Sequence, residues 1–368
     1  MIRRFGWLLL LVAVAFAVPA RAQNPDSAAR AVAWIRTQQD ASGGFAGIGI
    51  SSTADALFAL AAAGLKTDDV AVNGKNAQAF IEANVAEIAA KPGVAAKFVI
   101  AELLTGHSPR NVAGTDLVAA VTKGYNAETG VYGPDVTSHA LSILALVAAG
   151  EPLGGKAVDS LLAFQLDDGS WSFTGDRTAL GGDTNTTAVA LQALVAAGQR
   201  TSPAVARGVA YLETQRNADG GFPYSQASTF GTSSDANSTA LVIQAIVATG
   251  GNPTAAPWAD ASGNPVSALL AFQNANGAFR YDAATPDDNA FATYQAVPAL
   301  LYRTFPLEGI AIIQPAPAPE PTPAPTPAPG VPSELPNTGA PGVPAWPVVV
   351  VLAAGLLLMG AQLRRRTR

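Results

Sequence analysis

Cysteine is absent from all 368 residues of this chain. The protein therefore has no disulfide bridges, and it has no thiolate for zinc, iron–sulfur or nucleophilic chemistry. Charge is also scarce, since 13% of residues are charged and the net charge is −5. The body of the chain has no basic patch, so nucleic acid is not an expected partner.

Histidine is nearly absent too, with only His107 and His139. His107 follows the expected end of a helix, where a cation is favourable. His139 falls in the first turn of an expected buried helix. It is either packed and hydrogen-bonded or turned towards a central cavity.

The first 22 residues have the pattern of a secretory signal peptide. Arg3 and Arg4 are followed by an apolar run at 7–17, and Ala20 and Ala22 supply small residues before the expected cleavage after Ala22. A secreted chain without disulfides needs a large hydrophobic core.

The C-terminal residues 335–368 match a cell-wall sorting signal. Leu335-Pro336-Asn337-Thr338-Gly339 fits the L-P-x-T-G pattern that sortases recognise, and an apolar segment at 347–363 and a basic tail follow it. The resemblance implies that a sortase thiol attacks the Thr338 carbonyl, that Gly339 leaves with the tail, and that Thr338 is joined to peptidoglycan. The alternative is a simple C-terminal membrane anchor, with the 17 residues of 347–363 spanning the bilayer. Either arrangement places the body of the protein on the bacterial cell surface, because the basic end stays in the cytoplasm.

A Pro/Ala-rich linker at 307–334 separates this signal from the rest of the chain. Proline alternates with Ala, Thr and Glu over 315–332. Such a segment favours extended polyproline II at ~3.1 Å per residue, which gives a spacer of ~55 Å.

Between residues 23 and 306 the chain repeats itself. The repeated unit is an Ala-rich, apolar helix closed by glycine, and its clearest copies are 53–64, 138–150, 186–198 and 238–250. Val94–Gly106 is a weaker copy, and 289–301 is a last one without its glycine. Glycine after the last turn is a common helix stop, and a helix that is apolar on all faces is buried.

A second, more amphipathic helix precedes each buried one. The expected ranges are 26–38, 76–90, 115–124, 154–165, 202–215 and 265–273. No strand pattern is evident. Residues 23–306 are therefore predicted to be all-α: an (α/α)6 toroid of six helical hairpins. An open solenoid is the main alternative. A closed ring is favoured because both faces of the inner helices must be covered.

The loop from each outer to each inner helix carries a third repeated element. Gln165, Gly169 and Trp171 show it most fully, and related copies are Gln39-Gly43-Phe45, Gly130-Tyr132, Gln215-Gly220-Phe222 and Gln273-Gly277-Phe279. The aromatic residue is expected to pack back between hairpins. The pattern resembles the Q-x-x-x-G-x-W motif of squalene and hopene cyclases. This resemblance implies the α/α-toroid superfamily of terpenoid cyclases and protein prenyltransferases, with a transcobalamin-like variant among its relatives.

Motifs that the enzymatic relatives need are missing. The chain has no D-x-D-D for alkene protonation and no D-D-x-x-D for magnesium–diphosphate. Without cysteine, the prenyltransferase zinc site and a thioester crosslink cannot form. We therefore expect no metal, no cofactor and no catalytic residue of the usual kind.

One polar constellation recurs where the inner helices begin. Asp135, Asp183 and Asp235 precede their helices, and Asp287 or Asp288 is the expected counterpart in the last hairpin. Gln192, Gln244 and Gln295 lie deeper on three of these helices. The carboxylates are either helix caps or parts of a ligand site at one mouth of the ring. The predicted ligand-binding set is Asp135, Asp183, Asp235, Asp287, Asn185, Asn237 and Tyr224, with Phe173 and Tyr281 on adjoining loops.

The leading functional hypothesis is non-catalytic binding of a small or lipid-like ligand, of the corrinoid or isoprenoid class, or of a surface partner. A corrinoid is the one cofactor-like ligand that the resemblance suggests, although the small β-domain that closes over it in the carriers has no counterpart here. The alternatives are a divergent terpenoid-cyclase-like enzyme that uses Asp183 or Asp235 as its acid, and a structural adhesion module.

Overall fold

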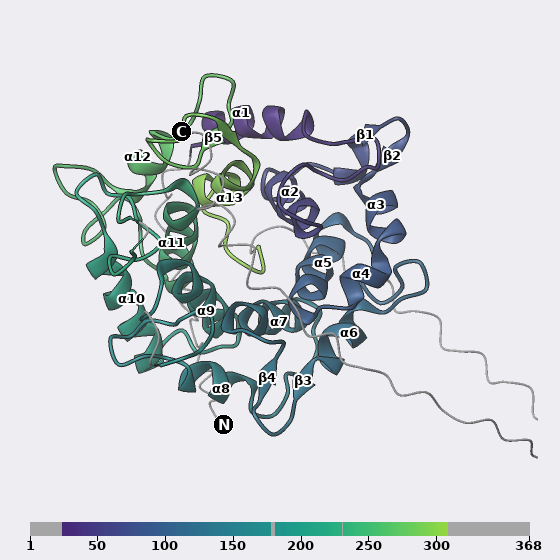
Figure 1. Ribbon diagram of the computed structural model, residues 1–368, viewed down its shortest axis with the longest axis horizontal. Helices are drawn as coiled ribbons and strands as arrows, with labels where there is room; N and C mark the ends of the chain where they lie inside the picture. The colour runs from purple at the N-terminus through teal and green to yellow at the C-terminus, as the bar shows by residue number, and fades with distance from the viewer. Residues whose placement is uncertain (1–23, 178–180, 230, 308–368) are drawn as a thin grey trace, which may run out of the picture. The chain divides into compact units, whose positions relative to one another are not determined.

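The computed structural model describes residues 24–177, 181–229 and 231–307. These residues form two concentric rings of helices (Figure 1). The inner ring consists of α2 (Ser51–Ala62), α5 (Pro92–Thr105), α7 (Val136–Ala148), α9 (Thr184–Ala196), α11 (Ala236–Thr249) and α13 (Ala290–Leu300). The outer ring consists of α1 (Pro25–Arg36), α3 (Ala77–Ala83), α4 (Val85–Ala89), α6 (Leu117–Lys123), α8 (Ala157–Ala163), α10 (Pro203–Gln215) and α12 (Pro265–Leu270).

The inner ring is closed. Each inner helix packs against the next one along the chain, and α13 packs against α2. At the seam, the Asn24 backbone N–H donates to the Leu300 carbonyl over 3.2 Å. The predicted toroid is confirmed, and the open solenoid is excluded.

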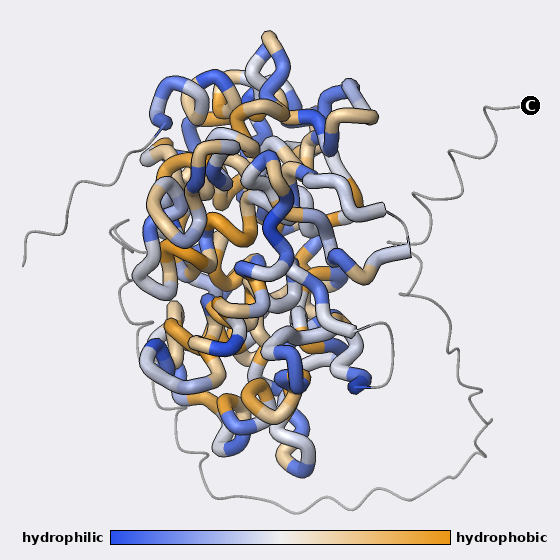
Figure 2. The backbone as a smooth tube through the Cα atoms, turned by 90° about the vertical axis from the view of Figure 1, so that its left-hand side faces the viewer, coloured by the Kyte–Doolittle hydropathy of each residue, from blue (hydrophilic) through white to orange (hydrophobic). Residues whose placement is uncertain are grey.

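Burial follows from the composition of each ring. On α11 every residue from Ala236 to Ala248 is buried, whereas α1 buries only Ala28, Ala31, Val32 and Ile35. Small alanine side chains let the inner helices approach one another and the outer ring closely. Figure 2 shows the same division, with apolar segments running through the middle of the molecule and polar ones towards its edges.

Two expectations from the sequence were wrong. The outer helix predicted at 76–90 is divided into α3 and α4 at Asn84, whose Nδ2 donates to the Phe80 carbonyl. Short antiparallel ladders also occur where no strand was expected: β1 (Ala71–Val72) with β2 (Lys75–Asn76), β3 (Tyr125–Asn126) with β4 (Val131–Tyr132), and β5 (Phe279–Arg280) with β6 (Asp288–Asn289). Each strand has two residues, which is too short for an alternating pattern to be visible. A 3-10 turn, η1 (Thr67–Asp69), completes the elements.

The glutamine–glycine–aromatic repeat fastens neighbouring hairpins together. Trp171 is fully buried, and its indole Nε1–H donates to the Leu161 carbonyl over 2.7 Å. The Gln165 amide donates to the Gly169 carbonyl of its own turn and to the Ala204 carbonyl of the next outer helix. The other aromatic residues of the repeat, Phe45, Tyr132, Phe222 and Phe279, are buried as well, as predicted.

Glycine is required in these turns because the next outer helix lies against them. A Cβ on Gly169 would stand 2.5 Å from the Arg207 carbonyl oxygen, and one on Gly277 would stand 2.4 Å from that of Arg30. Both glycines also have positive φ. The last turn thus packs on the first helix, and Gln273 donates to the Ser27 carbonyl across the seam.

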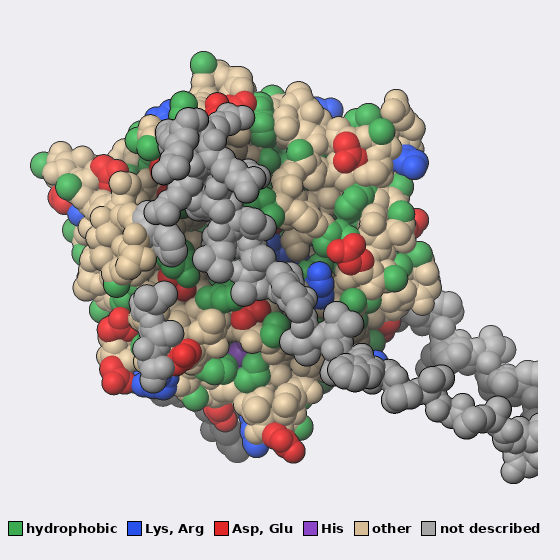
Figure 3. Space-filling model, viewed as in Figure 1, with side chains coloured by type: hydrophobic (Ala, Val, Ile, Leu, Met, Phe, Trp, Pro, Cys, Tyr) green, Lys and Arg blue, Asp and Glu red, His purple; other side chains and the backbone are tan. Residues whose placement is uncertain are grey.

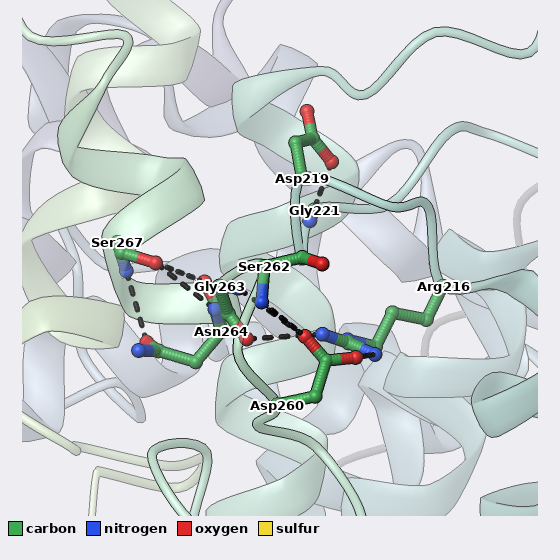
Figure 4. Close-up of polar contacts among 8 residues, drawn as sticks. All are labelled: Arg216, Asp219, Gly221, Asp260, Ser262, Gly263, Asn264 and Ser267. Atoms are coloured by element: carbon green, nitrogen blue, oxygen red, sulfur yellow. Dashed lines mark hydrogen bonds and ion pairs between the residues drawn. The ribbon is translucent and has the colours of Figure 1, made fainter.

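A polar junction joins the fifth hairpin to the sixth (Figure 4). The Arg216 guanidinium donates to the Asp260 carboxylate over 2.7 Å and to the Gly263 carbonyl over 3.0 Å. The same carboxylate accepts the Ser262 backbone N–H, and these contacts lower the pKa of Asp260 to about 2, with the Arg216 hydrogen bond as the largest cause. Asn264 then begins α12 with a capping box that includes Ser267. Across the residues that the structure describes, no helix has the length and apolar character to cross a membrane.

Candidate functional site at the mouth of the ring

The recurring aspartates are helix caps. Asp135, Asp183 and Asp235 each accept a backbone N–H from the first turn of their helix over 2.7 Å. The second carboxylate oxygen of Asp135 and Asp235 accepts the hydroxyl of Ser138 and Ser238, respectively. The three residues begin neighbouring inner helices, so they lie at the same end of the ring. Capping is therefore confirmed, and a direct role in ligand binding stays a prediction.

Burial raises the pKa of two of these acids. Asp183 and Asp235 are each 3% exposed, and this burial raises the pKa of both carboxyls to about 6 against the stabilising effect of their cap hydrogen bonds. Tyr224 also hydrogen-bonds to Asp183, which opposes the rise. Asp135 is only partly buried. The three caps are thus chemically unequal in spite of their shared position.

The counterpart in the last hairpin differs from the sequence expectation. Asn289 caps α13 by accepting the Ala292 N–H, so neither Asp287 nor Asp288 has the capping position. Asp287 is exposed. Asp288 accepts from Trp34 Nε1 and from the amides of Asn274 and Asn276, which ties the last hairpin to the first.

Loop residues after the repeat's aromatic complete the mouth. The carbonyls of Phe173, Tyr224 and Tyr281 accept the first helical N–H of the preceding inner helix, at Val136, Thr184 and Ala236. Each loop therefore covers the start of the helix before it. Phe173 keeps 38% of its surface exposed and Ile48, on the equivalent loop of the first hairpin, keeps 59%. On the face shown in Figure 3, charged side chains of both signs are scattered over the ring without a broad basic area.

The axis of the ring, called the lumen here, is lined by one face of each inner helix. On α11 this face is Asn237, Leu241 and Gln244, and on α9 it is Asn185, Val189 and Gln192, at the spacing that places residues on one side of a helix. Asn237 donates to Gln295 of α13 over 3.0 Å. Leu141, Val189 and Leu241 keep 7–8% exposure, whereas most of their helical neighbours have none. The lumen thus has the amides of Asn185 and Asn237 at its mouth, and one turn deeper Gln295 shares a layer with Leu141, Val189 and Leu241.

A partly buried ion pair lies opposite this apolar layer. Lys97 of α5 is 2.8 Å from both carboxylate oxygens of Asp55 on α2, and its ammonium lies 5.9 Å from the centre of the Phe291 ring on α13. Since α2 stands between α5 and α13, Lys97 reaches Phe291 across the lumenal side of α2. Burial raises the pKa of Asp55, and Lys97 opposes that rise.

The sequence reasoning missed this pair, although a signal was present. Asp55, Lys97 and Glu102 are the only Asp, Glu, Lys or Arg residues on the six inner helices as the structure bounds them. A charged side chain on a helix that is otherwise apolar on every face is costly to bury, so it marks a partner or a polar cavity.

The deep end of the lumen is closed by the chain that follows α13. The Phe305 ring meets Phe58 of α2 edge-on at 5.0 Å, and the Phe305 backbone N–H donates to Gln192 Oε1 of α9 over 3.0 Å. Because α2 and α9 stand on opposite sides of the six-helix ring (Figure 1), the two contacts of Phe305 place it across the ring axis. At a rise of ~1.5 Å per residue, Phe58 and Gln192 lie roughly 10–12 Å below the mouth. Phe305 therefore occupies the deep end of the lumen, and the helix caps lie at the opposite end.

Both histidines have structural roles. His139 Nδ1 accepts the Tyr132 backbone N–H over 3.0 Å, so Nε2 carries the proton and donates to the Ala157 carbonyl. Burial lowers the pKa of His139 to about 4. His139 thereby replaces the threonine hydroxyl that receives the equivalent N–H in four other hairpins. His107 pairs with Asp68 at 2.9 Å.

Glu102 is a buried acid outside the lumen. Its side chain is fully buried, and neither carboxylate oxygen has a hydrogen-bond partner within the described ranges. Burial raises the pKa of Glu102 to about 8; Gln78 opposes this, and the negative charges of Glu82 and Asp68 add to it. In the parts of the chain that the structure describes, no group of His, Asp or Glu side chains is arranged to hold a metal ion.

Comparison with known proteins places the fold. The sequence profile of the squalene–hopene cyclase C-terminal domain family matches residues 124–235. No curated protein matches the chain.

Solved structures match over most of the described chain. The type II terpene cyclase MstE from Scytonema aligns at a TM-score of 0.53 and 16% identity, over 75% of this chain and 97% of that one. A protein from Actinoplanes aligns at 0.52 and 16% identity, over 75% and 98%. Unsaturated glucuronyl hydrolase from Bacillus sp. GL1 aligns at 0.51 and 12% identity, over 75% and 94%. The chain therefore has the α/α-toroid fold that these structures share, and residues 124–235 resemble the squalene–hopene cyclase C-terminal domain.

Proposed function

We propose that the toroid binds a small amphipathic molecule in its lumen without converting it. The observation that carries this proposal is the mixed lining of the lumen: Asn185 and Asn237 lie near the mouth, Gln295 lies one turn deeper among the apolar Leu141, Val189 and Leu241, and the Asp55–Lys97 pair lies opposite. A largely apolar wall with a few placed polar groups is the usual composition of a small-molecule site. Lipid-like molecules of the isoprenoid or corrinoid class fit this description.

The same geometry argues against acid catalysis. A cyclase-like enzyme would use Asp183 and Asp235 as acids. Their carboxylates accept backbone N–H groups from the first turn of their own helices and are almost inaccessible to a substrate. The acid nearest the lumen, Asp55, is held by Lys97. An acid that donates a proton to a substrate must lie within hydrogen-bond reach of it.

A cyclase-like enzyme is the second candidate. Two observations favour it: the match of residues 124–235 to the cyclase profile, and the pKa of about 6 at Asp183 and Asp235. Incubating the protein with linear polyprenyl substrates, followed by mass spectrometry and NMR for ring formation, tests this candidate. Cyclised product that disappears in Asp183→Asn would establish it.

Native mass spectrometry tests binding. The mature chain, purified from its own cells, is expected to carry an added mass that the Asn237→Leu variant loses, because this change removes the amide that faces Gln295. Asn276→Leu is the matched control, since Asn276 lies on an outer-ring turn and bonds to Asp288. An unliganded wild-type protein, or equal retention by both variants, would refute the proposal.

We also propose that the protein acts on the bacterial cell surface. This rests on the sequence alone: the signal peptide with cleavage after Ala22, and the sorting signal at Leu335, Pro336, Thr338 and Gly339 with its apolar segment at 347–363. These residues lie outside the part of the chain that the structure describes. A sortase and peptidoglycan are the proposed partners, with the membrane as the anchor before or in place of sorting.

A further inference from the structure

The segment that closes the deep end of the lumen, residues 302–307, alternates between buried and partly buried residues. Leu307 is fully buried and Thr304 is 4% exposed. Phe305 contributes an aromatic ring against Phe58 and a backbone N–H to Gln192. The segment thus occupies the lumen as a ligand would, with one hydrogen-bond donor beside one aromatic ring.

The fit of this segment is nevertheless imperfect. Tyr302 and Leu307, at its two ends, have φ of 54° and 59°, a left-handed conformation that is unfavourable for residues other than glycine. Gln244, which stands at the same position of α11 as Gln192 on α9, keeps a buried Oε1 without a hydrogen-bond partner among the described residues. A buried acceptor without a donor costs folding free energy, which a ligand that supplies the donor would recover. The lumen floor therefore offers two amide acceptors, and the segment is bonded to only one.

We propose that residues 302–307 form a displaceable plug, and that Phe58, Gln192 and Gln244 form a deep subsite beneath it. The plug offers one aromatic ring and one N–H donor. The expected ligand has an aromatic or similarly flat apolar group and two N–H or O–H donors, one for Gln192 and one for Gln244. Ligand binding in the deep subsite shifts the plug from its bound to its released state, because the ligand and the plug cannot occupy the axis together. This inference rests on the proposed binding function of the lumen and extends it to the lower half.

The absence of native cysteine gives a direct assay of plug release. A single cysteine at Leu307→Cys in the full mature chain is labelled with a maleimide under native conditions. Two references bracket the rate: Leu161→Cys, fully buried in α8, and Ile48→Cys, 59% exposed on the mouth loop. The plug predicts labelling at Leu307→Cys at least tenfold faster than at Leu161→Cys. Equal, slow rates at the two buried positions would show that the segment is a permanent part of the core and would overturn the proposal.

A second change tests what holds the plug. Gln192→Leu, combined with Leu307→Cys, removes the acceptor of the Phe305 N–H and should speed labelling severalfold. Thr122→Val is the control, because it removes a side-chain hydrogen bond on outer helix α6, away from the lumen, and should leave the rate unchanged. Near-UV circular dichroism verifies that each variant is folded. Equal rates in these two variants would contradict the role given to Gln192.

The subsite is probed with 5-amino-1-naphthol, a fluorescent flat aromatic molecule that carries both an N–H and an O–H donor. Labelling of Leu307→Cys should rise with probe concentration and then saturate, and Gln244→Leu should raise the half-saturating concentration severalfold. Probe fluorescence without faster labelling would place the probe above the plug. That result would refute the deep subsite and leave binding at the mouth intact. A probe that changes neither the fluorescence nor the labelling rate would also refute the subsite. Failure of the proposed function itself is read separately, as an unliganded protein in native mass spectrometry.

Discussion

Glutamine at position 102 should make the protein more stable at neutral pH and change little in acid. Glu102 is fully buried in α5, its carboxylate has no hydrogen-bond partner at bonding distance among the described residues, and burial raises its pKa from 4.5 to about 8. The folded state therefore keeps the proton, whereas the unfolded chain releases it above pH 4.5. The stability associated with this group is fully present below pH 4.5 and is lost as the pH rises through 8. At ~1.36 kcal/mol per pH unit, the loss amounts to about 3 kcal/mol at pH 7 as an upper figure.

Urea unfolding of wild type and Glu102→Gln at pH 4.5, 6, 7 and 8 measures this effect. The variant has the shape of the protonated acid but cannot ionise, so its free energy of unfolding should exceed that of wild type increasingly with pH, by up to about 3 kcal/mol at pH 7. Glu82→Gln is the matched control: Glu82 is exposed and only adds a negative charge near Glu102, so we expect a change within about 0.5 kcal/mol. A difference between Glu102→Gln and wild type that is the same at pH 4.5 and pH 8 would refute the reasoning, because packing alone would then explain it.

Three further predictions concern the buried Trp171, the capping aspartates and the sorting signal. Trp171→Ala should lower the free energy of unfolding by about 3–5 kcal/mol in urea titrations, because it empties a fully buried site and leaves the Leu161 carbonyl without its indole donor; a loss under about 1 kcal/mol would contradict the inter-hairpin role. The triple variant Asp135→Asn, Asp183→Asn, Asp235→Asn should melt within a few degrees of wild type by circular dichroism, since asparagine also caps helices, and should lose the co-purifying ligand if the mouth needs their charge. A large drop in melting temperature with the ligand retained would leave these residues as caps alone. Thr338→Ala should move the protein from the wall fraction to the membrane or the medium; wall levels equal to wild type would refute sortase attachment.

The fold could be predicted from the sequence because the same sequence pattern recurs in successive hairpins. A glycine stop, an apolar helix and a buried aromatic such as Trp171 recur in most hairpins, so each copy supports the interpretation of the others. The elements that do not repeat were missed: the break between α3 and α4 at Asn84, and the two-residue ladders such as Tyr125–Asn126 with Val131–Tyr132. Local contacts decide these, and a single short segment has no periodicity to display.

The site could be predicted only in part. Position in the repeat placed Asp135, Asp183 and Asp235 at one end of the ring, but Asn289, not Asp287, continues the series, because the last hairpin reaches its cap two residues later. The pair of Asp55 and Lys97 comes from helices whose sequences share no motif around those residues, and only their packing side by side joins the charges. The plug depends on a turn after α13 that directs Phe305 across the axis, and nothing in the apolar sequence there distinguishes it from a helix continuing outward.

A crystal structure of the mature chain purified from its own cells tests the central claim most directly. The account predicts ordered non-protein density in the lumen, in contact with Asn237 at the mouth and with Gln295, Leu141, Val189 and Leu241 below. A lumen that contains only water above Phe305, in protein whose native mass is that of the unliganded chain, would contradict it.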